Sequence, residues 1–186
     1  MYYSAEKWEK MKKVVADFGY HKEYSKNGIE VKLKKYRNKR LGEELLVPAF
    51  YVDGTCWMIL TVRETENTQS EAIAEAKGHV AIAGVGIGWA LTKLMLKRAV
   101  KSIDVYELDS RVIDFFVEEF GDREGFGKVK FICGDVREQM IEKRYDFVYV
   151  DIYLSYKDKR ALQDKKLLLN NNDIKKYMFW GEGSQN

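Results

Sequence analysis

HVAIAGVGIGWALTKLMLKRAVKSIDVYELD, residues 79–109, is the stretch that decides the fold. It opens with a short, apolar, β-branched run, which predicts a strand buried on both faces of a parallel sheet. Gly84, Gly86 and Gly88 follow, and glycines there let the backbone turn sharply and approach a ligand at the start of a helix. An amphipathic helix, a second strand and the acid Glu107 complete the order. This order predicts half of a nucleoside-binding α/β domain.

The spacing of the glycines distinguishes between ligands. A dinucleotide-binding turn has the pattern G-x-G-x-x-G/A, in which the last small residue allows close packing of the helix on the strand. Here the pattern is G-x-G-x-G, and the bulky Trp89 stands at the sixth place. A phosphate-binding loop is also excluded, because no Gly-Lys-Ser/Thr follows the turn. The turn is therefore predicted to hold a ligand that lacks a pyrophosphate.

In these residues the chain resembles the class I S-adenosylmethionine-dependent methyltransferases. In that family the glycine turn lies against the methionine part of the cofactor, and an acid that ends the second strand holds the ribose hydroxyls. The resemblance implies S-adenosylmethionine as the cofactor and the following contacts to it: Gly84, Gly86, Gly88, Glu107 and Leu108. The position of Glu107 in the predicted fold favours a ligand-binding role even without the resemblance, because carboxylates at strand ends beside a glycine turn form the crevice where α/β proteins bind ligands.

The resemblance continues through VKFICGDVRE, residues 129–138. This segment gives a third strand followed by Asp135, which the family places near the exocyclic amine of adenine. Asp135 and the next residue, Val136, are therefore implied cofactor contacts. A structural alternative stays open for Asp135, because Asp is also a favoured N-cap of helices that follow strands.

YDFVYVDIY, residues 145–153, gives a fourth strand that ends at Asp151, where the family has its substrate-facing site. The resemblance implies Asp151 and Tyr153 as catalytic residues. Asp151 would orient or deprotonate the acceptor, and Tyr153 or Tyr156 would line the acceptor site. Asp151 has the same alternative as a helix cap.

Two branches of the superfamily resemble the chain most. The segments YELDSRVIDFF and YDFVYVD resemble the spermidine-synthase branch. A spaced W-M-x-x-T-x-x-E pattern resembles small methyltransferase-like proteins of phages and bacteria, and its residues are Trp57, Met58, Thr61 and Glu64. The resemblance as a whole covers roughly residues 58–153.

Three departures narrow the activity. Ile82 stands where many family members carry an acid two places before the first glycine. Asp151 is followed by Ile152, whereas the spermidine synthases have an Asp-Ser loop there, and this difference favours methyl transfer over aminopropyl transfer. The only proline is Pro48, so the Asn/Asp-Pro-Pro-aromatic motif of nucleic-acid amino-methyltransferases is absent.

Composition sets bounds on partners and location. The 186 residues suffice for one domain with an extension, and the net charge of +3 demands neither a nucleic acid nor a membrane partner. Residues 32–40 form a basic run. Such runs are most often solvated faces or loops, so nucleic acid is not the favoured partner. Cys56 and Cys133 lie in apolar runs without metal-ligand spacing, which predicts buried reduced thiols, no metal site and a cytoplasmic protein. No membrane segment or signal peptide is predicted.

The termini are predicted to extend this core. Ser4 and Gly19 bound a helix, and Asn27-Gly28 and Asp53-Gly54 mark two hairpin turns. We place the division between this extension, residues 1–62, and the cofactor-binding domain, residues 63–186. After Asp151 we predict a helix, a break at three asparagines, and a short helix capped by Asp173. The first of these helices is expected to bury Leu154, Leu162 and Leu169, and Phe179 and Trp180 either roof the pocket or, as we favour, cover the core.

The sequence therefore predicts an α/β fold, with a Rossmann-like parallel sheet that has helices on both faces and is truncated at its C-terminal end. The predicted function is transfer of a methyl group from S-adenosylmethionine to an unidentified acceptor, most readily a small molecule. Two alternatives stay open, a spermidine-synthase-like aminopropyltransferase and a non-catalytic S-adenosylmethionine-binding protein. An open sheet edge would favour a homodimer.

Overall fold

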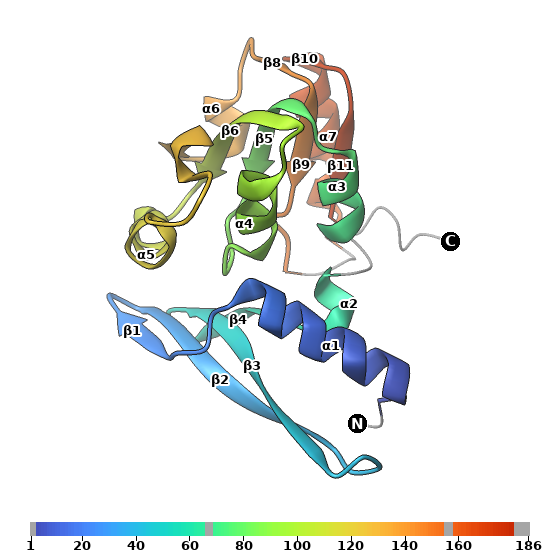
Figure 1. Ribbon diagram of the computed structural model, residues 1–186. Coiled ribbons are helices and arrows are strands. Elements are labelled where there is room, and N and C mark those ends of the chain that lie inside the picture. The colour runs from blue at the N-terminus through green and yellow to red at the C-terminus, as the bar shows by residue number, and fades with distance from the viewer. Residues whose placement is uncertain (1–2, 66–68, 155–157, 181–186) are drawn as a thin grey trace. The chain divides into compact units, whose positions relative to one another are not determined.

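The computed structural model describes residues 3–65, 69–154 and 158–180. The chain divides into two compact units, residues 1–67 and 68–186 (Figure 1). None of the helices in the described ranges combines the length and the apolar character that a membrane crossing needs.

The first unit is a helix and a four-stranded antiparallel sheet of order β1-β2-β3-β4. Its elements are α1 (Ala5–Phe18), β1 (Tyr24–Lys26), β2 (Ile29–Asn38), β3 (Glu43–Val52), β4 (Thr55–Ile59) and α2 (Val62–Glu64). The predicted helix boundaries are confirmed: the Ser4 hydroxyl accepts a hydrogen bond from the Lys7 amide, and Gly19 ends α1 in the left-handed conformation. The helix lies along one face of the sheet (Figure 1), and it buries one apolar stripe: Trp8, Met11, Val15 and Phe18.

Both predicted hairpin turns are confirmed. Asn27 and Gly28 have φ values of 52° and 81°, and Asp53 and Gly54 have 47° and 76°. A two-residue turn with positive φ at both positions matches the right-handed twist of the strands it joins. These local signals therefore set the pairing of β1 with β2 and of β3 with β4 next to the turns.

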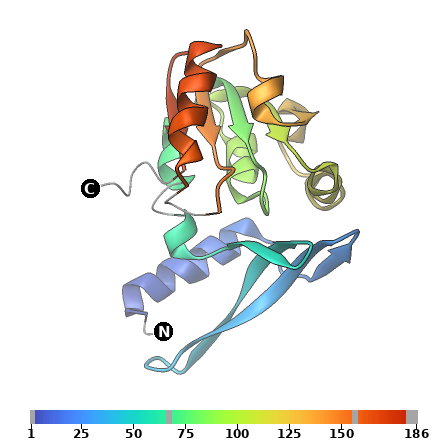
Figure 2. The same ribbon diagram turned by 180° about the vertical axis from the view of Figure 1, so that it is seen from behind.

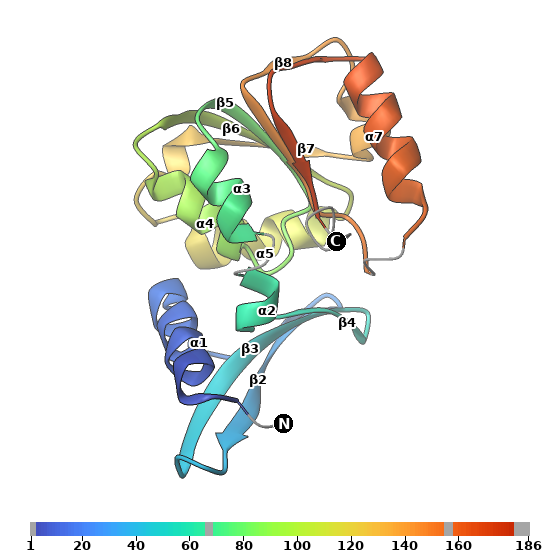
Figure 3. The same ribbon diagram turned by 90° about the vertical axis from the view of Figure 1, so that its right-hand side faces the viewer.

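The second unit is a Rossmann-like α/β fold, as predicted. A parallel sheet of five strands has the order β11-β9-β5-β6-β7. Its strands are β5 (Gly78–Ala83), β6 (Val100–Glu107), β7 (Val129–Cys133), β9 (Phe147–Val150) and β11 (Tyr177–Phe179), and a separate pair is formed by β8 (Arg144–Tyr145) and β10 (Asp173–Ile174). The helices are α3 (Ser70–Glu75), α4 (Trp89–Leu96), α5 (Ser110–Phe120), α6 (Val136–Gln139) and α7 (Arg160–Asn170), with a 3-10 turn at Phe126–Lys128. Figure 2 and Figure 3 show α3 and α4 on one face of the sheet and α7 on the other.

The predicted short helix after the asparagine break is wrong. The residues form β10 and β11 instead, and β11 pairs in parallel with β9. Without β11, one edge of β9 would present unpaired backbone groups, so sheet pairing outweighs the local preference for a helix. Phe179 and Trp180 are buried at this edge, in agreement with the core-covering alternative.

Two burial predictions are also wrong. Leu154 and Leu162 are exposed, because α7 begins only at Arg160 and turns a different face inward, on which Asp164 and Leu168 are buried. Both cysteines are free but exposed rather than buried. Cys56 lies on β4 and Cys133 ends β7, and each strand is at the edge of its sheet, where fewer neighbours cover a side chain.

Candidate functional site

The candidate site lies along the carboxyl edge of the parallel sheet. Three backbone hydrogen bonds continue the sheet one residue beyond the strands: Gly84 donates to Tyr106 at 2.9 Å, Gly134 donates to Glu107 at 2.9 Å, and Asp151 donates to Ala83 at 2.8 Å. The glycine turn after β5, the acid that ends β6 and the acid after β9 are thereby brought to one edge, as predicted. Ligands of open α/β sheets bind at this edge.

The glycine turn has a backbone that only glycine adopts without strain. Gly84, Gly86 and Gly88 have φ values of 88°, 54° and 90°. A Cβ atom on Gly84 would lie 2.1 Å from the Asp151 carbonyl oxygen, and one on Gly88 would lie 2.4 Å from the Phe116 ring. The glycines therefore allow close packing of the turn against both neighbouring segments.

Glu107 ties the turn to the end of β6. Its Oε2 accepts a hydrogen bond from the Val85 amide at 2.9 Å, and its Oε1 accepts one from the Asp109 amide at 3.0 Å. Burial raises the pKa of Glu107, and the backbone donors oppose this shift. Each carboxylate oxygen has two lone pairs. Each can therefore accept a further hydrogen bond from a ligand hydroxyl.

Beside Glu107 the edge offers apolar surface. Leu108 is 71% exposed, although it is a large apolar residue. The exposed Cys133 lies next to it, with its Sγ 4.0 Å from the Leu108 carbonyl oxygen. Val136, the first residue of α6, is buried. An exposed apolar side chain next to a half-buried carboxylate suits a flat base carried on a ribose.

Asp135 has the helix-capping role that the sequence left open as an alternative. It is the N-cap of α6, and its Oδ1 accepts a hydrogen bond from the Arg137 amide at 2.9 Å. The Arg137 guanidinium also donates to both Asp135 oxygens, at 3.1 and 3.0 Å. Because these bonds leave lone pairs on the carboxylate, capping and contact with a ligand amine are compatible.

A buried carboxylate that the sequence did not reveal lies next to this cap. Asp164 on α7 accepts hydrogen bonds from Arg137 Nε at 2.7 Å and Nη2 at 2.8 Å. It also accepts one from the Tyr153 hydroxyl at 2.9 Å. Burial and this carboxylate raise the pKa of Tyr153. Tyr153 is thus a buried group that ties the segment after β9 to α7, with its hydroxyl proton engaged by Asp164.

Asp151 is held by two side chains rather than acting as a helix cap. Its Oδ2 accepts a hydrogen bond from Gln69 Nε2 at 3.1 Å and one from the Tyr149 hydroxyl at 3.2 Å. Gln69 directly precedes α3 and is only 4% exposed. Sequence reasoning missed it, because no local pattern marks a glutamine as the partner of an acid 82 residues away. Tyr156 lies outside the described residues.

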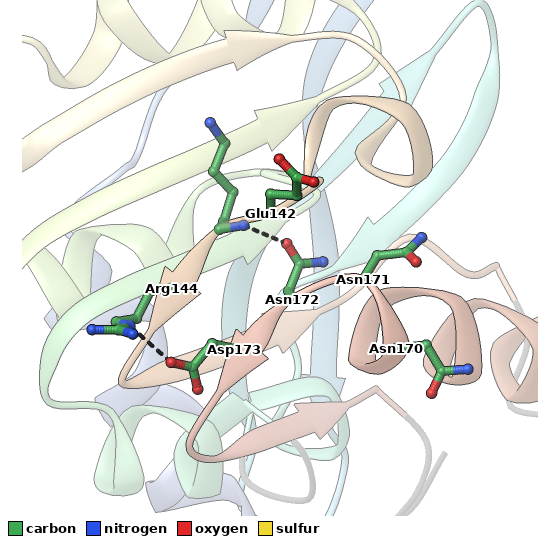
Figure 4. Close-up of a pocket in the computed structure, with 7 residues that line it drawn as sticks. Glu142, Arg144, Asn170, Asn171, Asn172 and Asp173 are labelled. Atoms are coloured by element: carbon green, nitrogen blue, oxygen red, sulfur yellow. Dashed lines mark hydrogen bonds and ion pairs between the residues drawn. The ribbon is translucent and has the colours of Figure 1, made fainter.

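A separate hollow of about 420 Å³ lies between the segments around β8 and β10 (Figure 4). Here the Lys143 amide donates to Asn172 Oδ1 at 2.9 Å, and Arg144 pairs with Asp173 at 2.7 Å. It shares no lining residue with the carboxyl edge, and its ion pair is exposed to solvent. The described ranges contain no group of three acids, histidines or cysteines that could hold a metal ion.

The fold matches solved structures at low sequence identity. A spermidine synthase in complex with the transition-state analogue AdoDATO matches with a TM-score of 0.52 and 14% identity, over 82% of this chain and 52% of that one. The spermidine synthase of Thermotoga maritima matches with a TM-score of 0.51 and 13% identity, over 82% and 53%. A DhpI–SAM–HEP complex matches with a TM-score of 0.44 and 15% identity, over 62% of this chain and 54% of that one.

The chain spans about half the length of the spermidine synthases that it matches. No protein-family model matches the sequence, and no curated protein matches it. The chain has the fold of the two spermidine synthases, the branch that its sequence resembles.

Proposed function

We propose that this protein binds S-adenosylmethionine at the carboxyl edge of the sheet and transfers its methyl group to a small-molecule acceptor. One observation carries the proposal: the Glu107 carboxylate is bonded to the Val85 amide inside the glycine turn, at 2.9 Å. This contact places an acceptor for hydroxyl groups directly beside a turn in which every second residue, Gly84, Gly86 and Gly88, has no side chain. A ribose and the chain attached to it need those two features next to each other.

The described residues fit such a cofactor along its length. The exposed Leu108 would cover one face of the adenine, with Asp135 towards its amine. Glu107 would accept the ribose hydroxyls. Gly86 would leave room for the methionine part, since it carries no Cβ, and Gly84 would let the segment at Asp151 pack closely against the turn. We keep Val136 as a buried support of the adenine site.

Methyl transfer from this cofactor needs little help from acids and bases. S-adenosylmethionine supplies a methyl group that its sulfonium already activates. The chain has to align the acceptor with that methyl group and exclude water. We assign this task to Asp151, because it follows β9 at the carboxyl edge, its backbone carbonyl packs against Gly84, and Gln69 and Tyr149 donate hydrogen bonds to its carboxylate. It would orient the acceptor and take its proton, while Tyr153 would position the segment that follows.

Aminopropyl transfer is the second candidate, because the two spermidine synthases have TM-scores above 0.5. It differs in requiring decarboxylated cofactor and a diamine. Both reactions would use the same edge of the sheet, so the site alone does not separate them. An assay with S-adenosylmethionine and another with its decarboxylated form and a diamine do.

The test is transfer of a labelled methyl group from S-adenosylmethionine to members of a small-molecule acceptor panel. We expect Asp151→Asn to keep cofactor affinity and lower turnover by about 10²–10⁴, the range for a lost general base. The matched control is Asp173→Asn, which removes an acid from the hollow at the other end of the sheet and should leave turnover unchanged. Full turnover by a folded Asp151→Asn variant would remove Asp151 from the mechanism. Cofactor binding without transfer to any acceptor would indicate a binding protein.

A further inference from the structure

A local motif occurs three times in the chain, each time just before a helix. An Asp carboxylate accepts a hydrogen bond from the backbone amide of the Arg two places later, at 2.9 to 3.0 Å: Asp109 and Arg111, Asp135 and Arg137, and Asp158 and Arg160. In the first and third of these pairs, the guanidinium also turns its Nε and Nη2 atoms to the carboxylate of its own pair. This fork onto the neighbouring Asp is the geometry that the motif adopts by itself.

Arg137 differs from the other two arginines. Its Nε and Nη2 atoms lie 2.7 and 2.8 Å from the oxygens of Asp164 on α7, and only Nη1 reaches Asp135. The side chain of Asp164 is 7% exposed, against 30% for that of Asp135. A guanidinium pairs more strongly with the carboxylate that water reaches less, because the local dielectric constant is lower there. Asp164 therefore diverts the fork of Arg137 away from Asp135.

The diversion leaves Asp135 with an oxygen that is only partly occupied. In the described part of the chain, Asp135 Oδ2 accepts a hydrogen bond from Arg137 Nη1 alone, at 3.0 Å. The corresponding atom, Asp109 Oδ2, accepts from both Nε and Nη2 of Arg111. A carboxylate oxygen has two lone pairs, so Asp135 Oδ2 can accept from one more donor. Asp135 directly follows the residue whose amide bonds Glu107 at the carboxyl edge of the sheet.

We propose that Asp164 is a positioning residue that lets Asp135 recognise the exocyclic amine of adenine. By holding the fork of Arg137, Asp164 keeps Asp135 Oδ2 open to one N–H of that amine. Asp164 acts through Arg137 and needs no contact with the cofactor. This inference rests on the proposed function, and it adds how the chain selects adenine over a purine that presents an oxygen at the same position.

Two cofactor analogues measure this selection. S-adenosylhomocysteine carries the amine, and S-inosylhomocysteine carries a carbonyl oxygen in its place. A carboxylate has no donor for that oxygen, so calorimetry on the unaltered full chain should show S-adenosylhomocysteine binding at least about tenfold more tightly. The ratio of the two affinities is the readout, because a purely structural change would weaken both analogues alike.

Asp164→Asn removes the charge that holds the fork and keeps an acceptor for the Tyr153 hydroxyl. Arg137 should then fork onto Asp135, as the other two arginines do onto their own acids, and the preference for S-adenosylhomocysteine should fall below about threefold. Asp164→Ser carries the same prediction and decides the test where Asp164→Asn fails to fold. The control is Asp158→Asn, which removes the acid of the third pair and should leave the ratio unchanged.

A rescue separates diversion of Arg137 from a general effect of the substitution. Adding Arg137→Gln to Asp164→Asn removes the fork itself, so Asp135 Oδ2 is open again and the preference should return to at least about tenfold. No return of the preference would mean that Asp164 does not act through Arg137 and would overturn the inference. An unchanged ratio in Asp164→Asn, or an equal loss in Asp158→Asn, would overturn it too.

Failure of the proposed function looks different. The unaltered protein would then bind neither analogue, and the inference would fall with it. Binding of both analogues with equal affinity would keep a cofactor site but show that Asp135 does not recognise the amine, which overturns the inference alone.

Discussion

Replacing Glu107 by glutamine separates the proposed ribose contact from the structural contacts of the same side chain. Glu107 accepts backbone hydrogen bonds from Val85 and Asp109, and the glutamine oxygen can keep only one of them. A hydrogen bond to a charged group contributes about 1.5–3 kcal/mol. Removing the charge offsets part of this loss, because burial raises the pKa of Glu107 and its ionisation therefore opposes folding. We expect the free energy of unfolding to fall by less than about 2 kcal/mol.

The effect on binding should be larger. The glutamine NH₂ group cannot accept a ribose hydroxyl, so we expect S-adenosylhomocysteine to bind at least about tenfold more weakly, which corresponds to about 1.4 kcal/mol. Calorimetry measures the affinity, and thermal unfolding confirms that the variant folds. The control is Glu75→Gln, which removes an exposed acid of α3 that pairs with Lys176.

The pH dependence of stability and of cofactor affinity is a second test of Glu107, because the two should change in opposite directions. With a raised pKa, Glu107 in the free protein takes up a proton at higher pH than an ordinary glutamate does. Its contribution to stability is fully present below its ordinary pKa and is lost as the pH rises through the raised value. Binding has the opposite dependence, because the ribose contacts favour the carboxylate. Affinity should therefore fall as the pH is lowered from 7.5 towards 5, and Glu107→Gln should remove that trend. Equal affinity of the folded variant and the unaltered protein would refute the assignment of Glu107 to the ribose.

Three further substitution or protection experiments follow from the site. A non-glycine residue in the left-handed conformation costs about 1–2 kcal/mol. Gly84→Ala should lower the free energy of unfolding by more than this, because the new Cβ would also lie 2.1 Å from the Asp151 carbonyl oxygen. The control is Gly127→Ala, which has open space around the new Cβ and should leave thermal unfolding unchanged. Both thiols should react with a thiol reagent in the folded protein, and S-adenosylhomocysteine should protect Cys133 but not Cys56; equal protection would place the adenine elsewhere. Tyr153→Phe should lower the unfolding free energy by about 1.5–3 kcal/mol in denaturant titration, and no change would mean that its hydrogen bond to the α7 carboxylate contributes nothing.

The sequence predicted those parts of the structure that local chemistry determines. Ser4 and Gly19 bound α1 because capping depends on a few neighbouring residues. Asn27-Gly28 makes a hairpin turn because both residues tolerate positive φ. The strands β5 and β7 follow from short apolar runs beside glycine, and the order of motifs along the chain was enough to indicate the parallel sheet.

The sequence did not predict features that depend on distant partners. β11 forms a strand because β9 presents an open edge, which its own residues do not encode. Asp164 is buried because Arg137 and Tyr153 pair with it, yet in sequence it is an acid beside two lysines and resembles a solvated position. Gln69 likewise acquires its role only through contact with Asp151.

The central claim is tested most directly by calorimetric titration of the full chain with S-adenosylmethionine and, separately, with NAD. The glycine turn that ends in Gly88 and Trp89, and the carboxylate of Glu107 bonded to that turn, predict saturable binding of S-adenosylmethionine with one site per chain and no measurable binding of NAD. Tight binding of NAD, or no heat of binding with S-adenosylmethionine, would contradict the account.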